Sequence, residues 1–365
     1  MRVLFDYQIL YLQKYGGISR YFHELIRHLI SMYPDDSFDI KAAISQNYYF
    51  RDMVPQRKLL RHGNRLLNNV SMKYEILKAD ISGKGIDIIH PTYYMPGYLD
   101  DRIRKKSRLV ITVHDMTYEH YMLSDNRVIE ARRKLFLQAD GIITVSENTR
   151  NDLLNIYPYL SSKPVCTIYH GSIDPVCKAC DPAVSLTGEY ILYVGSRSGY
   201  KDFPMLIKAF AAIADKYGSV SIICAGGGEF GAEEKKLISE AGLEGRVIQR
   251  SMSDDELSLA YKNAICFVYP SQYEGFGLPI LEAFENTCPV ILRNASCFPE
   301  IAGDAALYFD DTEELSESIS SLIDDKEKRV MLSEKGTGRL QRYSWEKAAE
   351  KTYDFYREIL GHDEY

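Results

Sequence analysis

The sequence predicts an α/β protein built from two domains, each with a parallel sheet at its centre. Three observations favour this class. Short apolar runs, typical of strands buried on both faces, alternate with helical patterns through both halves of the chain. The 365 residues are more than one hydrophobic core usually serves. With 45% hydrophobic and 26% charged residues, the composition is that of an ordinary globular protein.

Apolar segments of strand length recur along the chain. They lie at residues 3–5, 40–44, 86–89, 109–113 and 141–145 in the first half, and at 190–194, 220–225, 246–249, 264–269 and 289–292 in the second. Polar or turn residues follow each segment. We therefore expect loops to gather at the carboxyl ends of the strands, which is the edge where open α/β sheets bind ligands.

The stretch between 171 and 188 predicts the domain boundary, because it contains Pro175 and Pro182 and has no clear periodicity. Trp345 begins a last helical pattern. The expected parts are a first domain at 1–175, a linker at 176–188, a second domain at 189–342 and a terminal helix within 343–365.

Basic residues are concentrated in the first half, although the net charge is −7. They cluster at 51–78, interleaved with leucines, and again at 102–108. A basic amphipathic segment can bind an anionic membrane surface or a lipid-linked phosphate, but a solvated helix face and a charged loop would give the same pattern. A pI of about 5.7 without a recognisable nucleic-acid-binding module argues against a nucleic-acid partner.

The sequence contains no recognisable signal peptide or membrane-spanning segment. Arg2 and Asp6 interrupt the N-terminal apolar stretch, and no apolar run approaches the ~20 residues that a bilayer requires. We expect a cytoplasmic protein whose basic segments could touch the inner face of the membrane. The seven scattered cysteines agree with a reducing compartment, and the lone pair Cys177 and Cys180 is a weak metal signal.

The stretch from Ala264 to Asn294 is the strongest candidate for a ligand site. Pro279 suits the first turn of a helix between two expected strands, and Gly275, Phe276, Gly277 and Leu278 precede it. The two glycines let the backbone approach a ligand closely. The free N–H groups of the first turn attract anions and hydroxyl oxygens.

Two carboxylates flank this helix start. Glu274 lies just before the amides and Glu282 about one turn into the helix, so both can face one cleft. Carboxylates beside N–H donors suit a polyhydroxylated ligand, with a vicinal diol as the natural partner. The alternative is that Glu282 only complements the helix dipole and Glu274 is a solvated loop charge.

The segment from Glu274 to Glu282, within EGFGLPILEAF, resembles the Glu-x7-Glu element of retaining glycosyltransferase family 4. The resemblance covers nearly all the chain and is strongest from 190 to 310. It implies the GT-B fold, in which two Rossmann-like domains face each other across a cleft and a C-terminal helix returns to the first domain. It also implies transfer of a hexose-type sugar from a nucleoside diphosphate to a hydroxyl acceptor, with retention, where the acceptor is a lipid-linked glycan in polysaccharide or glycolipid assembly.

The resemblance assigns further residues on three loops, which hold Arg197 with Lys201, His114, and Gly16 with Gly17. Arg197 and Lys201, in the loop after 190–194, match the family's diphosphate-binding arginine and lysine. His114, after 109–113, matches a histidine that contacts the donor sugar. By themselves, these could be ordinary loop cations and a structural histidine. The expected catalytic residues are His114, Arg197, Lys201 and Glu274, and the expected donor-binding residues are Gly16, Gly17, Gly275, Phe276, Gly277, Leu278 and Glu282.

No Asp-x-Asp sequence occurs in the chain. This agrees with a site in which cations and helix amides, rather than a divalent metal, stabilise the departing diphosphate. We expect no cofactor and no metal beyond the nucleotide-sugar donor. Asn286 stands where relatives usually have a glycine after the helix, and asparagine tolerates the left-handed conformation that ends a helix. A GT-B epimerase or hydrolase, or a non-catalytic nucleotide-sugar-binding protein, would fit the same motifs.

Overall fold

The computed structural model describes residues 1–42, 45, 47–54, 61–83, 85–94, 97–99, 106–121, 126–172 and 188–361, without the side chains of 61–66, 80, 81 and 126. The chain forms two compact units, Met1–Gly171 with Ser344–Tyr365, and Ser172–Tyr343. The chain thus changes units at Ser172 and at Ser344, whereas the sequence analysis placed these boundaries after 175 and after 342. Apart from Gly188, the expected linker lies outside the described residues, as do Cys177 and Cys180.

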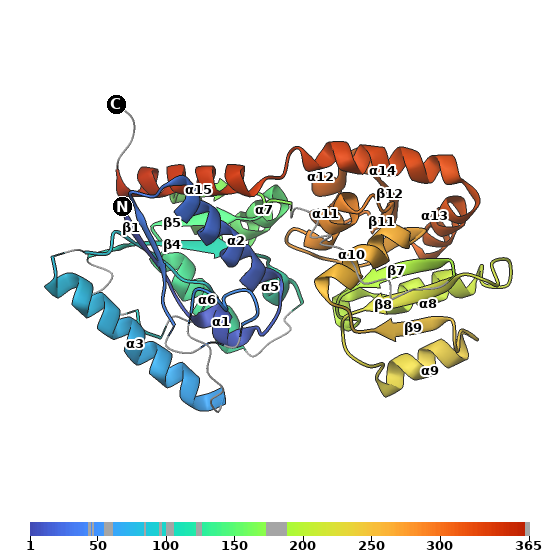
Figure 1. Cartoon of the computed structure of the whole chain (residues 1–365), viewed down its shortest axis with the longest axis horizontal. Helices are drawn as coiled ribbons and strands as arrows, with labels where there is room; N and C mark the ends of the chain where they lie inside the picture. Colours follow the sequence, from blue (N-terminus) through green and yellow to red (C-terminus); the bar gives the residue numbers. More distant parts are fainter. Residues whose placement is uncertain are drawn as a thin grey trace. The chain divides into compact units, whose positions relative to one another are not determined.

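The first unit is built on a six-stranded parallel sheet (Figure 1). Its strand order is β2-β1-β3-β4-β5-β6, so the direction of winding reverses between β1 and β3. The strands are β1 (Arg2–Phe5), β2 (Ser37–Ile40), β3 (Ile88–His90), β4 (Arg108–Val113), β5 (Gly141–Thr144) and β6 (Val165–Thr167). The predicted strand at 40–44 is displaced, because the strand found there ends at Ile40.

The helices of the first unit are α1 (Gln8–Leu12), α2 (Gly17–Met32), α3 (Arg61–Ile81), α5 (Thr117–Tyr121), α6 (Asn126–Gln138), α7 (Glu147–Ile156), the 3₁₀ turn η1 (Pro158–Ser162) and α15 (Trp345–Leu360). The C-terminal helix α15 lies beside α2 over the sheet (Figure 1). Gly141 permits this packing, because a Cβ there would lie 2.7 Å from Ile359 Cδ1. The expected return of the C-terminal helix to the first unit is confirmed. No helix within the described ranges is both long and apolar enough to cross a bilayer.

The second unit also has a six-stranded parallel sheet, with the order β12-β11-β10-β7-β8-β9. Its strands are β7 (Tyr190–Val194), β8 (Ser221–Ala225), β9 (Val247–Arg250), β10 (Cys266–Tyr269), β11 (Val290–Arg293) and β12 (Ala306–Phe309). The winding reverses between β7 and β10. Ligands of open α/β sheets bind at the carboxyl ends of the strands that flank such a reversal.

The helices of the second unit are η2 (Gly199–Lys201), α8 (Phe203–Ala211), α9 (Ala232–Glu240), α10 (Asp254–Asn263), α11 (Leu278–Glu285), α12 (Phe298–Ala302), η3 (Gly303–Ala305), α13 (Thr312–Asp324) and α14 (Lys326–Leu340). Side-chain caps fix several starts. The Ser253 hydroxyl accepts from the Glu256 N–H at the start of α10, and the Asp311 carboxylate accepts from two N–H groups at the start of α13. The predicted class, α/β with parallel sheets, is confirmed in both units.

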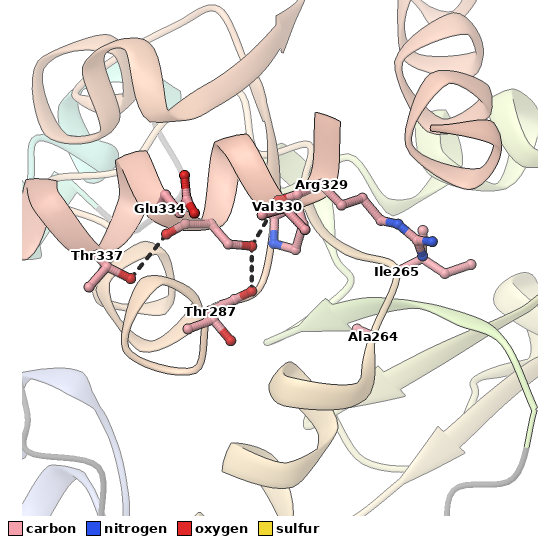
Figure 2. A pocket seen from close by; sticks show the side chains of 9 residues that line it. Ala264, Ile265, Thr287, Arg329, Val330, Glu334 and Thr337 are labelled. Carbon is pink, nitrogen blue, oxygen red and sulfur yellow. Dashed lines mark hydrogen bonds between the residues drawn. The ribbon is translucent and has the colours of Figure 1, made fainter. Parts of the chain in front are cut away.

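The end of α11 differs from expectation. Asn286 has φ −96°, and it is Thr287 that takes the left-handed conformation, with φ 53°. Thr287 lines a hollow of about 420 Å³ at the amino ends of β10 and β11, and its carbonyl accepts from the Ser333 hydroxyl of α14 at 2.6 Å (Figure 2). This hollow lies at the opposite edge of the sheet from Lys201, Glu274 and the other predicted site residues of the second unit. A β-branched side chain with positive φ is strained.

Replacing Thr287 with glycine should therefore raise the free energy of unfolding by about 0.5–1 kcal/mol, since glycine removes the strain but loses more backbone entropy on folding. Urea denaturation would measure the change. Thr287→Ala is the control, because alanine keeps a Cβ in the same conformation and should bring no gain. If Thr287→Gly were less stable than Thr287→Ala by about 0.5–1 kcal/mol, the entropy cost of glycine alone, φ at this position would store no strain.

Candidate active site

The carboxyl ends of β7 and β10 bring two of the predicted residues together. Cys266 pairs with Ile191 in the sheet, so the loops after these strands are neighbours, and the Gln272 N–H joins them by donating to the Tyr200 carbonyl at 2.8 Å. Lys201 from one loop forms an ion pair with Glu274 from the other. Their side chains are 15% and 14% exposed. The structure therefore places an amine and a carboxylate at the point where the winding of the sheet reverses.

Glu274 is held by two residues that the sequence analysis did not identify. The Ser296 hydroxyl accepts from the Glu274 N–H at 3.1 Å and donates to the Glu274 carbonyl at 2.6 Å. The second residue is Tyr269, whose hydroxyl donates a hydrogen bond to the Glu274 carboxylate. Burial, and then the negative charge of Glu274, hold the pKa of Tyr269 well above its usual value. The Glu274 backbone and side chain are thus both fixed. Ser296 follows β11 and carries no sequence signal of this role.

Arg197 binds the glycine-rich loop, residues 226–228, that follows β8. Its side chain is 1% exposed, and its Nε donates to Glu234 at 2.7 Å. Its two terminal nitrogens each donate at 2.8 Å, to the carbonyls of Gly226 and Gly228. A Cβ at Gly227 would lie 2.6 Å from Arg197 Nη1, so this close approach requires glycine. A diphosphate could meet the guanidinium only if these hydrogen bonds were exchanged.

The pairing of Arg197 with Glu234 affects the pKa of Glu234. Although burial acts to raise its pKa, the hydrogen bond from Arg197 and the one from the Gly231 N–H lower it. Glu234 also completes the first turn of α9, where its carboxylate accepts from Gly231 at 2.7 Å. Arg197 therefore ties three segments of the second unit together: its own loop, the glycine-rich loop and α9.

The start of α11 agrees with the predicted ligand loop. Gly277 has φ 90°, a conformation that favours glycine, and Leu278 and Pro279 open the helix. Phe276 is buried against the ring of Tyr343, with the ring centroids 5.8 Å apart. The predicted residues from Gly275 to Leu278 thus form a packed turn at the carboxyl end of β10.

Glu282 is half-buried one turn into α11. The Tyr261 hydroxyl donates to its Oε2 at 3.2 Å, and Asn286 Nδ2 donates to its main-chain carbonyl at 2.8 Å. Burial, and then Glu282, raise the pKa of Asp254 at the start of α10. Glu282 therefore contributes negative charge between α10 and α11.

His114 lies at the carboxyl end of β4 in the first unit and is buried. Its main-chain N–H donates to the Tyr94 hydroxyl at 3.1 Å, and its ring meets the Tyr21 ring edge-on at 5.0 Å between centroids. Its Nε2 has no hydrogen-bond partner among the residues that the structure describes. Burial lowers the pKa of His114 to about 4, so the ring is neutral near pH 7.

Arg132 binds the loop that carries His114. The sequence analysis did not identify this residue. Its guanidinium lies 4.1 Å from the Tyr94 ring centroid and donates to the Asp115 carbonyl at 2.7 Å. Its Nε pairs with Glu119 at 2.8 Å. Asp115 follows His114 in the chain, and the Tyr94 hydroxyl accepts from the His114 main-chain N–H, so Arg132 contacts both neighbours of His114. A lone arginine in a helical pattern gives no sign of such burial.

Gly16 and Gly17 lie where α2 begins. Gln13 folds back here, and its Oε1 accepts from the Ser19 N–H at 3.1 Å. A Cβ at Gly16 would lie 2.5 Å from that oxygen, so the glycine leaves space for Gln13 to cap the helix. Gly16 thus has a structural role in addition to any contact with a ligand.

Within the described residues, no group of three His, Cys, Asp or Glu side chains could hold a metal ion.

Comparison with known proteins identifies the chain. The model of glycosyl transferases group 1 matches residues 182–339, and that of Glycosyltransferase Family 4 matches residues 15–174. The chain belongs to glycosyltransferase family 4. O-antigen chain mannosyltransferase B of Escherichia coli is 28% identical to this family 4 enzyme over 379 residues, which cover 93% of this chain and 96% of the relative. D-inositol 3-phosphate glycosyltransferase of Corynebacterium urealyticum is 25% identical, over 76% of this chain and 72% of the relative.

Solved structures confirm the GT-B fold of this family 4 member. Sucrose-phosphate synthase from Thermosynechococcus elongatus superposes with a TM-score of 0.77 at 20% identity, covering 99% of both chains. HepE from Anabaena, in complex with UDP, gives a TM-score of 0.71 at 17% identity, covering 98% of this chain and 100% of HepE. At these identities the likeness establishes the fold, and the chain is a glycosyltransferase by its family.

Proposed function

We propose that this family 4 glycosyltransferase moves a hexose from a nucleoside diphosphate to a hydroxyl of a glycan, with retention and without a metal ion. The observation that carries the proposal is the Lys201–Glu274 pair beside the Gly275–Leu278 turn, where the winding of the second sheet reverses. An amine, a carboxylate and backbone amides in one place match the groups of a nucleotide sugar. The likeness to an O-antigen mannosyltransferase favours a role in polysaccharide assembly.

Four side chains have a role in this proposal. Lys201 neutralises the diphosphate, whose charge grows as the glycosidic bond breaks. Glu274 accepts from hydroxyls of the transferred sugar, and Glu282 from the ribose diol. His114, neutral because its pKa is lowered by burial, donates or accepts a hydrogen bond at the sugar through its unpartnered Nε2. A diphosphate oxygen takes the acceptor's proton on the face from which the leaving group departs.

A direct test separates the two carboxylates. Glu282→Ala should weaken binding of both the nucleoside diphosphate and the nucleotide sugar, because a lost hydrogen bond to a charged group costs ~1.5–3 kcal/mol. Glu274→Ala should weaken binding of the nucleotide sugar alone. Titration calorimetry with UDP, GDP and their hexose conjugates would measure both. Equal losses of nucleoside-diphosphate affinity in the two variants would contradict the division.

Product analysis tests the reaction itself. Incubation of donor with a glycan acceptor should give a new glycosidic bond. Release of free sugar or an epimer without acceptor would indicate a hydrolase or an epimerase, and donor binding without turnover on any acceptor would indicate a sensor.

For the acceptor we propose a lipid-linked glycan, reached by a cytoplasmic enzyme that rests on an anionic membrane through α3. Leu67, Val70, Tyr74 and Leu77 are all exposed, and their spacing of three, four and three residues places them on one helix face. Lys73 and Lys78 are exposed beside them. An apolar stripe with neighbouring lysines suits an interfacial helix. Of the basic residues in 51–78 and 102–108, Arg57, Lys58 and the 102–105 run lie outside the described residues.

Changing both Val70 and Leu77 to glutamate should abolish sedimentation of the enzyme with anionic vesicles, since the stripe would then carry charge into the headgroup region. Val330→Glu in the second unit is the matched control, because Val330 is 57% exposed and Val70 is 59% exposed. Turnover of a short water-soluble acceptor should survive in all variants. Wild-type protein that stays in solution with anionic vesicles at low salt would contradict the membrane proposal.

A further inference from the structure

Three tyrosines, two exposed and one half-buried, form a cluster beside the start of α2. The centroid of the Tyr15 ring lies 5.4 Å from that of Tyr48 and 5.1 Å from that of Tyr49, and the last two are 5.5 Å apart. Tyr15 is 52% exposed and Tyr48 is 43% exposed. Arg51 lies over the Tyr48 ring, 4.2 Å from its centroid. We call these four residues the tyrosine platform.

Hydrogen bonds of the platform's main chain, and of the neighbouring Asn47 side chain, hold the platform in place. Asn47 is buried, and its Nδ2 donates to the Gln13 carbonyl at 2.7 Å while its Oδ1 accepts from the Tyr49 N–H at 3.0 Å. The Tyr48 N–H donates to the Lys14 carbonyl at 2.9 Å. These bonds join the loop before α2 to the loop after β2. Because the loops are already fixed, binding of a ligand to the rings costs little conformational entropy. A small contact area can then give useful affinity.

The position of the platform relates it to the candidate site in the same unit. Both of its loops follow the carboxyl ends of strands: Tyr15 comes after β1 and α1, and Tyr48 and Tyr49 come after β2. His114 follows β4 and so lies on the same edge of this parallel sheet. His23 of α2 lies beside the platform, with its ring 6.1 Å from that of Tyr49. The edge that carries His114 thus also carries the platform.

We propose that the tyrosine platform is a subsite for a pyranose ring of the glycan acceptor, which rests on the proposed function. The C–H groups of a pyranose pack against the negative face of an aromatic ring, while its hydroxyls remain free for polar partners. Tyrosine suits this use because it offers a rigid apolar face and a hydroxyl together. Arg51 adds donors for the sugar hydroxyls at one end of the cluster. Scattered exposed tyrosines need no such account, but a contiguous, braced set beside a site does.

The test measures glycan binding without any donor. Affinity electrophoresis through gels that contain α-mannan, dextran or α-galactan would compare wild-type protein with Tyr15→Ala and Tyr48→Ala. Each alanine variant should lose about tenfold in affinity for the polymer that retards the wild type. Tyr48→Phe should bind as the wild type does, because the ring face remains. Tyr159→Ala is the matched control, since Tyr159 is also 43% exposed in the first unit and lies outside the platform.

Kinetics give a second readout. Tyr15→Ala and Tyr48→Ala should raise the acceptor KM about tenfold, with donor KM and nucleotide affinity unchanged. Wild-type protein that is retarded by none of the three polymers would overturn the proposal, as would alanine variants that bind like Tyr159→Ala. If the platform instead serves a protein partner, acceptor KM would not change. The proposed function fails separately, by absence of nucleotide binding, which these variants do not affect.

Discussion

Replacing Lys201 with alanine should lower kcat by about 10²–10³, the loss seen when a preorganised donor to a developing negative charge is removed. The ammonium group is half-buried at the point where the second sheet reverses its winding, and it is paired with Glu274. In the proposed reaction, the donor diphosphate competes with Glu274 for this cation. Because the bridging oxygen gains charge as the glycosidic bond breaks, a cation held there binds the transition state more tightly than the donor. Donor KM should change less than kcat.

Initial rates at saturating donor would test this. Lys208→Ala is the matched control, because Lys208 is an exposed lysine in the next helix, α8, and it should leave kcat unchanged. Lys201→Arg should recover part of the rate, since the charge is kept but its geometry changes. Turnover should persist in excess EDTA. If chelation stops the reaction and Mg²⁺ restores it, or if Lys201→Ala retains near-normal kcat, this account of the leaving group is wrong.

Replacing Arg132 with methionine should lower the free energy of unfolding by about 3–5 kcal/mol, the usual cost of breaking a buried ion pair. The Arg132 side chain is 0% exposed and that of Glu119 only 3%. Removal of the cation leaves the Glu119 carboxylate buried without its charge partner, and removes the donor to the Asp115 carbonyl. Urea denaturation monitored by circular dichroism would measure the loss.

The chain offers its own control for this variant. Arg133 and Glu130, on the same helix α6, form an exposed pair at 2.9 Å with side chains 44% and 45% exposed, so Arg133→Met should have little effect. Removing both buried charges, with Arg132→Met and Glu119→Leu together, should recover much of the lost stability. If Arg132→Met is as mild as Arg133→Met, the buried pair does not hold the loop that carries His114.

The strands and loops that lie at the centre of each sheet were predictable from sequence. The segments at 190–194 and 109–113 are found as β7 and β4, because a strand buried on both faces is a continuous apolar run. The strands that were missed, β6 and β12, are edge strands with partly exposed residues, so their apolar pattern is weak. The displaced strand β2 is also at an edge.

The fold class, the family and the loop that runs from Glu274 to Glu282 could be predicted from the sequence, because strand periodicity and a contiguous motif are local properties of the chain. The positions of the long side chains could not, because they depend on contacts between segments. Arg197 and Lys201 occupy the same loop, yet Arg197 turns under the glycine-rich loop to Glu234 while Lys201 meets Glu274. Arg132 and Ser296 reach their partners from distant segments. A long side chain binds whatever donors and acceptors the folded chain brings within its reach, and that neighbourhood depends on which strands lie side by side.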